Sequence, residues 1–343
     1  MGFDDLNARE RKILQHLINH YVLTADPVGS RVIAQKYRMG LSPATIRNTM
    51  QDLEEMGLIR QPHTSAGRVP TDSGYRVFVD MLLKEEPLSS SEKARIRKII
   101  NQNRKGIDSI LSQTSRILAE ITNQLGISIA PKFEESVFTR INLIPVSEGR
   151  ILVVVAVKSG LARSILMEAE SDVDHVELIK MEEILNERLT GLTLGQIQKT
   201  VSERLSDTRC SPRLVKLFLD PSSDIWSDIH PAKLHLGGTD RLISQPEFSD
   251  RGKLAEFVKF LEDKESLVQL LESKSIGEGL VITIGSENAA REIRNCSLVT
   301  TSYQAGRLSG IVGIIGPTRM PYSKLISIVQ YTARSLTDAL SEA

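Results

Sequence analysis

The sequence contains very little cysteine and no long apolar run. Only two cysteines, Cys210 and Cys296, occur in 343 residues, and they form no C-x-x-C pair. A disulfide framework or a zinc site is therefore not expected, and a reducing compartment fits this composition. The longest apolar run, residues 151–157, is far too short to cross a bilayer, and the opening MGFDDLNARERK contains no apolar signal region. We expect a cytoplasmic protein with no membrane partner.

The sequence also lacks the motifs of the common catalytic sites. It contains no G-x-S-x-G elbow, no H-E-x-x-H helix, no Walker loop and no G-x-G-x-x-G fingerprint. Its six histidines are scattered. His16 and His20 have the i,i+4 spacing of two metal ligands on a helix, but no nearby cysteine completes a site, so a polar helix edge is favoured. The sequence predicts no enzyme, no cofactor and no bound metal.

An excess of charge of one sign is absent as well. The 43 Lys and Arg residues are balanced by 43 Asp and Glu residues. Global charge therefore argues neither for nor against a nucleic-acid partner, which must be met by a local patch. Hydrophobic residues make up 41% and charged residues 25%, as in ordinary globular proteins, and 343 residues suggest two or three domains.

Helical signals begin near the N-terminus. Asn7 and Glu10 have the spacing of a capping box, and apolar residues follow them at helical intervals. Ser30 is expected to cap a short second helix over residues 31–37. These two helices are separated by the break at Thr24-Ala25-Asp26-Pro27, which a helix does not continue through.

A third helix and a hairpin come next. Ser42 is an expected cap, Pro43 stands at the first helical position, and Gly57 ends the helix. Residues 58–71 then have the pattern of two short extended segments around a Thr-Ser-Ala-Gly tip. Three helices and a hairpin, with a short turn between the second and third helices, predict a winged helix-turn-helix over residues 1–83.

The third helix is polarised in charge. With Ile46, Met50 and Leu53 facing the core, the residues expected to face out are Thr45, Asn48, Thr49 and, in part, Arg47 and Gln51. The acids Asp52, Glu54 and Glu55 lie in the last turn and a half, where they repel a phosphate backbone. Between residues 27 and 76 seven basic residues exceed four acids by three (7 − 4). We therefore expect the N-terminal half of this helix to face DNA, since helix N-termini favour phosphate.

The predicted DNA-binding residues lie on this helix and on the hairpin: Ser42, Thr45, Arg47, Asn48, Gln51, His63, Thr64, Ser65, Gly67 and Arg68. Asn48 and Gln51 are candidates for adenine, Arg47 for guanine or phosphate, and Thr45 for a thymine methyl or phosphate. Arg68 and the hairpin backbone are expected at phosphate or in the minor groove. The alternative is a scaffold whose helix-turn-helix binds only protein, which predicts no salt-dependent DNA binding.

Two stretches resemble a known family. SPATIRNTMQDLEEMGLI followed by HTSAGRVPTDSGYRVFVD resembles HrcA, the heat-inducible transcription repressor of bacteria, and the resemblance continues in GRLSGIVGIIGPTRMPYSKLISIVQYTARSLTDAL. It implies a dimeric repressor that binds double-stranded DNA at an inverted repeat upstream of chaperone operons of the groE and dnaK types. It also implies that the chaperonin keeps the repressor active.

A linker and a long helical pattern follow the winged helix. Residues 74–83 are expected to form a short helix, and residues 84–91 are polar with a proline and three serines, as in a linker. Apolar residues at steps of three and four then extend from 92 to 125, with a kink or a break expected at Gly106. An intersubunit coiled coil and a helix packed on its own sheet are both compatible with this pattern.

The remainder alternates between strands and helices. Strands are expected at residues 138–144, 151–157 and 161–168, then at 234–236, 242–243, 280–284, 298–303 and 311–315. Helices are expected between 172 and 229, at 254–271 and from Tyr322. A sheet that is opened, interrupted and completed later predicts an α+β multidomain protein with an inserted helical subdomain over 172–232. The resemblance implies that residues 92–171 and 233–343 form a GAF-like α/β domain and that the insert serves dimerisation.

One loop leaves a small-ligand alternative open. Gly285-Ser286-Glu287-Asn288 follows a predicted strand, and it has the composition of an anion cradle or, as favoured, of a simple serine cap. A metabolite-responsive winged-helix repressor whose GAF-like domain binds a small effector is therefore the alternative function. It requires a roomy polar pocket near the strands between 280 and 308.

Overall fold

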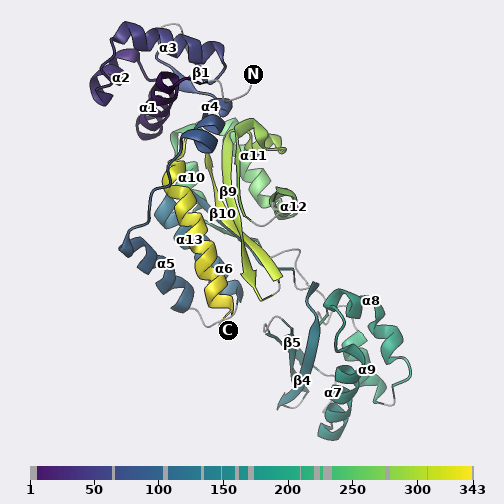
Figure 1. The fold of residues 1–343 in the computed structure, drawn as a ribbon. Coiled ribbons are helices and arrows are strands. Elements are labelled where there is room, and N and C mark those ends of the chain that lie inside the picture. Colours follow the sequence, from purple (N-terminus) through teal and green to yellow (C-terminus); the bar gives the residue numbers. More distant parts are fainter. Residues whose placement is uncertain are drawn as a thin grey trace.

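The protein consists of three parts that follow one another along an elongated molecule (Figure 1). The computed structural model describes residues 6–63, 66–102, 107–132, 135–147, 149–158, 162–168, 174–208, 210–219, 225–226, 234–274, 279–306 and 308–341. The winged helix lies at one end, a five-stranded sheet with helices in the middle, and a three-stranded sheet with its own helices at the other end. No helix in these described ranges combines the length and the apolar character needed to cross a bilayer.

The N-terminal part is the predicted winged helix. It consists of α1 (Ala8–Thr24), α2 (Ser30–Tyr37), α3 (Pro43–Glu55) and the paired strands β1 (Ile59–Arg60) and β2 (Val69–Pro70). The capping box is confirmed, because the Asn7 side chain accepts from the N–H of Glu10 at 3.0 Å and the Glu10 carboxylate accepts from the N–H of Asn7 at 2.9 Å. The cap expected at Ser30 is wrong: Ser30 is the first residue of α2, and Gly29 precedes it without a side-chain bond.

The long helical pattern is two helices, α5 (Ser90–Gln102) and α6 (Ile107–Thr122), and the kink or break expected at Gly106 lies outside the described residues. Before them, α4 (Asp72–Val77) continues into a π-helical segment, Phe78–Leu82. α6 packs on a sheet of its own chain: Leu111 and Leu118 are buried, and the Ser128 hydroxyl donates to the Leu111 carbonyl at 2.8 Å. Of the two alternatives, packing on the sheet is the one observed for α6.

The central sheet is antiparallel, with strand order β7-β3-β10-β9-β8. Its strands are β3 (Leu125–Ile129), β7 (Leu234–Gly237), β8 (Leu280–Ile284), β9 (Cys296–Ala305) and β10 (Leu308–Pro317). Figure 1 shows α6 and α13 (Tyr322–Ser341) on one face and α11 (Arg251–Glu262) and α12 (Lys264–Lys274) on the other. Val312 and Ile314 belong to the first core, whereas Ile311 and Ile315 belong to the second, as strand alternation requires.

Three secondary-structure predictions for this part are wrong. β3 was not predicted, residues 242–243 belong to the short helix α10 (Thr239–Ile243) instead of a strand, and the helix expected at 254–271 is the pair α11 and α12. The pair divides at Asp263, whose carboxylate accepts from the N–H of Ser266 at 3.1 Å and so begins a new helix.

The distal part has a sheet of its own. β4 (Phe138–Ser147), β5 (Arg150–Val157) and β6 (Ala162–Glu168) form a separate sheet in the order β4-β5-β6. α7 (His175–Leu189), α8 (Leu194–Leu205) and α9 (Pro212–Leu219) share a core with its inner face, where Ile151, Val153 and Val155 are buried. The expectation that this meander opens the sheet completed by the later strands is therefore wrong. Because β3 pairs with β7, the segment between these two strands leaves and re-enters the central sheet at one place.

Candidate nucleic-acid interface

The outer face of α3 carries the predicted reading residues. Arg47, Asn48 and Gln51 are exposed, while Ile46, Met50 and Leu53 are buried against the rest of the winged helix. The Gln51 amide lies 3.3 Å from a carboxylate oxygen of Glu55, one turn further along the helix. Arg47, Asn48 and Gln51 therefore offer exposed polar groups, as contacts with base edges require.

Thr49 does not belong to this face, and its expected exposure is wrong. Its side chain is only 2% exposed, and its hydroxyl donates to the Thr45 carbonyl at 3.2 Å. The physical reason is helical spacing, since Thr49 lies three residues after Ile46 and therefore shares its buried stripe.

The N-terminus of α3 is closed by a serine cap. The Ser42 hydroxyl oxygen accepts from the N–H of Thr45 at 3.1 Å, and the two hydroxyls lie 2.9 Å apart. Ser42 is exposed and Thr45 is half-buried, so both stand at the helix end where the dipole is positive. The two hydroxyls are hydrogen-bonded to each other. The positive end of the helix dipole is exposed here and can attract a phosphate.

The wing is tied to the loop between α1 and α2. Val28 and Arg68 exchange both backbone N–H···O bonds at 2.9 Å. The residue directly before β2 is therefore paired with the loop between α1 and α2. A Cβ at Gly67 would lie 2.5 Å from the Val28 carbonyl carbon, which explains the glycine at this position. His63 is exposed, Gly67 is half-buried, and the predicted contacts Thr64 and Ser65 lie outside the described residues.

Arg68 has a partner inside the protein. Its Nη2 lies 2.8 Å from a carboxylate oxygen of Glu54, and the two side chains are only 21% and 31% exposed. The Glu54 carboxylate also accepts from the N–H of Gln61 on the wing at 2.9 Å. Glu54 therefore joins the last turn of α3 to both arms of the wing. Sequence reasoning missed this pair, because it assigned the arginine to phosphate and the acid to repulsion of phosphate.

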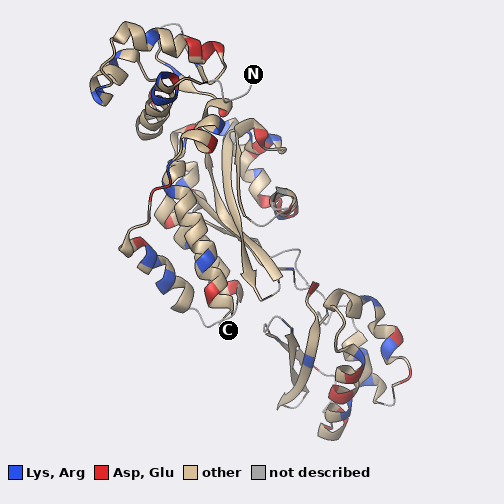
Figure 2. Ribbon diagram, in the orientation of Figure 1, with Lys and Arg blue, Asp and Glu red and all other residues tan. Residues whose placement is uncertain are grey.

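The charges of the winged helix are separated in space. Figure 2 shows acidic residues at the C-terminal end of α3 and basic residues on α2 and toward the other end of α3. Between residues 27 and 76 the exposed basic residues are Arg31, Lys36, Arg38, Arg47 and Arg60. A DNA backbone would be attracted to the side of α2 and the N-terminal half of α3.

The Thr-Asp-Ser-Gly-Tyr-Arg run after the wing has structural roles. The Thr71 hydroxyl donates to the Gly57 carbonyl at 2.6 Å and accepts from the N–H of Gly74 at 3.1 Å, which caps α4. A Cβ at Gly74 would lie 2.0 Å from the Leu58 carbonyl oxygen, so this position requires glycine. The run fixes α4 directly against the base of the wing.

The other candidate sites are accounted for by internal contacts. His16 stacks on Tyr37 with ring centroids 4.3 Å apart, and burial, followed by the charge of Lys12, lowers the pKa of His16. Within the described residues no group of three or more His, Cys, Asp or Glu could hold a metal. At the loop 285–288, the favoured interpretation of Ser286 as a helix cap is wrong, because Ser286 lies inside the short 3-10 helix Gly285–Glu287. Its N–H donates to the Asp72 carboxylate at 2.8 Å, so the anion at this loop is an internal one.

Comparisons with known proteins give one family for two separate stretches of the chain. A family model described as "Winged helix-turn-helix transcription repressor, HrcA DNA-binding" matches residues 5–81, and one described as "HrcA protein C terminal domain" matches residues 108–326. The heat-inducible transcription repressor HrcA of Chlorobium phaeobacteroides (strain BS1) is 38% identical over 352 residues, which cover 99% of this chain and 100% of that protein. The repressor of the same name from Geobacter sulfurreducens is 37% identical over 338 residues, covering 98% of each.

A solved structure has the same fold. The crystal structure of a hypothetical protein at 2.2 Å resolution matches with a TM-score of 0.67 and 22% sequence identity, covering 98% of this chain and 99% of that one. At this identity the likeness concerns the arrangement of the chain alone.

Proposed function

The chain belongs to the HrcA family of heat-inducible transcription repressors, and we propose that it represses chaperone operons by binding an inverted-repeat operator as a dimer. Membership makes the protein a DNA-binding regulator with a winged helix and not an enzyme. The observation that carries the proposal is the polarity of α3, with exposed Arg47, Asn48 and Gln51 before the acidic last turn.

The proposed complex places the N-terminal half of α3 in the major groove. Asn48 and Gln51 are assigned to adenine, Arg47 to guanine or phosphate, and Thr45 to a thymine methyl or phosphate. Ser42 caps the N-terminus of α3, and the positive end of the helix dipole there is assigned to a backbone phosphate. Two subunits reach successive faces of one duplex when the half-site centres lie roughly 34–36 Å apart or a multiple of that.

The wing supplies the second contact region. His63, Thr64, Ser65 and Gly67 are assigned to the sugar-phosphate backbone or the minor groove, because a tip of small polar residues can approach closely. The ion pair with Glu54 supports a different role for Arg68: it fastens the wing to the last turn of α3.

The distal part is the proposed dimerisation subdomain, and the contact is assigned to the outer face of its sheet. The register places Ile144 beside Leu152 and Leu152 beside Leu166, so an apolar row crosses the three strands on the face opposite the helices. Ile144 on β4 and Leu166 on β6 are 45% and 53% exposed, unusual for large apolar side chains on one face of a sheet. A second copy of this face would bury the row by twofold symmetry.

The β4 edge of the same sheet is already covered by side chains of α7. The Asn186 and Glu182 side chains of α7 accept from the backbone N–H groups of Ile141 and Leu143 on β4, each at 2.8 Å. This arrangement favours association through the face of the sheet over pairing at the β4 edge. Leu166→Asp should therefore yield monomers in sedimentation equilibrium, whereas Leu23→Asp, at a 75% exposed leucine of α1, should leave the dimer intact. A dimer that survives Leu166→Asp would exclude this face.

Two further elements of the proposal rest on the family resemblance. The central α/β domain, with helices on both faces of an antiparallel sheet, is assigned as GAF-like. Chaperonin is assigned as the factor that maintains the active repressor. Adding chaperonin to a binding assay should raise the fraction of protein that binds the operator without changing its base preference.

Fluorescence anisotropy tests the proposed function directly. The probes are a duplex carrying the chaperone-operon inverted repeat and a scrambled duplex of equal composition, each at two salt concentrations. A preference of about 10³-fold or more for the repeat is the result expected of a sequence-specific repressor. Equal binding of both duplexes by a chaperonin-treated sample would reject the proposal.

One observation favours the alternative function, an effector-responsive repressor. An open surface depression of about 330 Å³ lies beside β8 and β9 and is lined by Leu280, Thr301, Ser302, Arg334 and Thr337 among others. This volume is at the lower end for small-molecule sites. A thermal-shift screen would favour the alternative if one metabolite stabilised the protein saturably and altered operator affinity.

A further inference from the structure

Two side chains of α4 reach from the winged helix to the central domain. Arg76 donates from Nε and Nη2 to the two carboxylate oxygens of Glu287, at 2.8 and 2.5 Å, and from Nη2 to the Ile282 carbonyl at 2.7 Å. Asp72 accepts from the N–H of Ser286 at 2.8 Å. We call these five residues the latch. A bidentate guanidinium–carboxylate pair fixes direction as well as distance, so the latch constrains the angle between the two domains.

The central domain provides a shaped seat for Asp72. Gly285 has a φ of +54°, a conformation that favours glycine, and a Cβ there would lie 2.2 Å from the Asp72 carboxylate oxygen. The carboxylate therefore lies directly against the glycine backbone. Any larger residue at this position would displace Asp72 from the Ser286 N–H.

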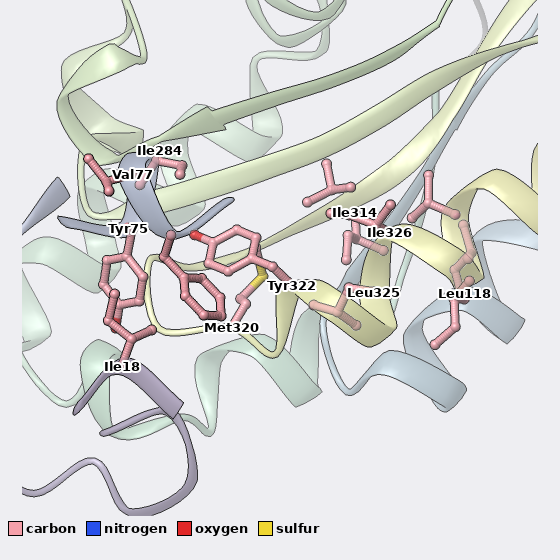
Figure 3. Close-up of a cluster of buried hydrophobic side chains, with 14 of the residues drawn as sticks. Ile18, Tyr75, Val77, Leu118, Ile284, Ile314, Met320, Tyr322, Leu325 and Ile326 are labelled. Carbon is pink, nitrogen blue, oxygen red and sulfur yellow. The ribbon is translucent and has the colours of Figure 1, made fainter. Parts of the chain in front are cut away.

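An apolar contact between the same two domains accompanies the latch. Figure 3 shows Tyr75 and Val77, on the α4 side, facing Ile284, Met320 and Tyr322 of the central domain. The rings of Tyr75 and Tyr322 lie 6.0 Å apart between centroids, and both residues are buried.

On the α1 side, Arg319 of the central domain donates to the Val22 carbonyl at 2.8 Å. The same guanidinium donates to the Glu247 carboxylate at 2.5 Å, so it is held from its own domain as well. The winged helix is thus fixed at two separate polar points, which opposes rotation about either one.

α4, which carries Asp72 and Arg76, is bonded to the end of the reading helix through the base of the wing. α4 begins two residues after β2, and the Thr71 N–H and hydroxyl bond the carbonyls of Leu58 and Gly57 at 3.1 and 2.6 Å. Leu58 lies three residues after the end of α3, and its N–H donates to the Leu53 carbonyl at 3.0 Å. The orientation of α4 on the central domain therefore determines the orientation of α3.

We propose that Asp72 and Arg76 are positioning residues that set the spacing of half-sites the repressor accepts. This inference rests on the proposed function, since it requires two reading helices on one operator. A winged helix of this size gives a lever of about 20 Å, and a rotation of about 10° at the latch moves α3 by about 3.5 Å, the rise of one base pair. A fixed latch excludes operators with one base pair more or less between their half-sites, and a loosened latch admits them.

The test compares spacing preference with half-site affinity in the full-length protein. The duplexes carry the chaperone-operon repeat, the same repeat with one base pair added or removed between its half-sites, a single half-site, and a scrambled sequence. The variants are Glu287→Gln, which leaves every DNA-domain residue unchanged, and Gly285→Ala, which removes the seat of Asp72. Arg95→Gln is the matched control, because it breaks an ion pair of the same 2.5 Å length between α5 and α6.

We expect the wild-type protein to bind the natural spacing about tenfold or more tightly than the altered spacings, as bivalent binding with a rigid connection predicts. Glu287→Gln and Gly285→Ala should lower this ratio at least about threefold and leave half-site affinity within about twofold, whereas Arg95→Gln should change neither. Far-ultraviolet circular dichroism establishes that each variant is folded.

The possible failures are distinguishable. If the wild type does not prefer the repeat to the scrambled duplex, the proposed function itself fails. If the wild type prefers the repeat but ignores spacing, or if both latch variants keep the wild-type ratio, the positioning role is wrong. Equal loss of affinity on every duplex, half-site included, would assign the latch to stability alone.

Discussion

The ion pair between Arg68 and Glu54 yields a prediction that separates a structural role from a DNA contact. At 2.8 Å and with side chains 21% and 31% exposed, the pair lies between the exposed and buried classes. Exposed pairs contribute about 0.2–1 kcal/mol, and removing one partner of a fully buried pair costs about 3–5 kcal/mol. We therefore expect a coupling free energy of about 1–2 kcal/mol between the two residues.

A double-mutant cycle measures that coupling. Urea unfolding of the wild type, Arg68→Ala, Glu54→Ala and the double variant gives four free energies of unfolding. The two single-variant losses should together exceed the loss of the double variant by about 1–2 kcal/mol. The same four proteins are then titrated with operator at several salt concentrations.

The salt dependence distinguishes the two roles of Arg68. Because Glu54 already compensates its charge, Arg68→Ala should leave the slope of log affinity against log salt nearly unchanged while lowering affinity for all duplexes. Arg47→Ala is the control, because Arg47 is exposed and makes no ion pair within the described residues; its loss should reduce the slope by about 0.9 per subunit. Equal reductions for the two variants, with no coupling to Glu54, would refute the structural role.

Other substitutions test the packing behind this interface. Gly74→Ala should destabilise the winged helix by about 2–3 kcal/mol in urea unfolding, because the new Cβ would lie 2.0 Å from a backbone oxygen. The control Gly29→Ala, whose Cβ would have nothing within 4 Å, should cost less than about 1 kcal/mol. Similar losses for the two variants would disprove the close approach at Gly74. Burial raises the pKa of the Cys296 thiol to about 12, so Ellman's reagent at pH 8 should label half-buried Cys210 in the native protein and reach Cys296 only after unfolding. Labelling of Cys296 at the rate of Cys210 would contradict its burial.

The winged helix could be predicted because its signals are local. Caps at Asn7 and Ser42 and the spacing of the apolar residues define its helices within a few residues of sequence. The exposure of Thr49 was mispredicted, although its position three residues after Ile46 contained the needed information. The partner of Arg68 was not predictable in the same way, since wing and helix meet only after folding.

The later strands show the limit of what a local sequence pattern can predict. Nearly all were predicted from their apolar runs, but such runs do not specify a pairing partner, so the meander was assigned to the wrong sheet. β3 was missed because its apolar residues directly follow those of α6. Asn123, which adopts a left-handed conformation with φ of +56°, was the available signal that the helix ends there.

The central claim is that the N-terminal half of α3 reads bases, and Asn48→Ala tests it most directly. Wild type and variant are titrated with a panel of operators in which each half-site position is replaced in turn, with Asp52→Ala, at the acidic end of the same helix, as control. We predict that Asn48→Ala loses about 1–3 kcal/mol on the natural operator and becomes indifferent to the base at one position, while Asp52→Ala keeps the wild-type preferences. An Asn48→Ala protein with the full wild-type preference at every position would contradict the account.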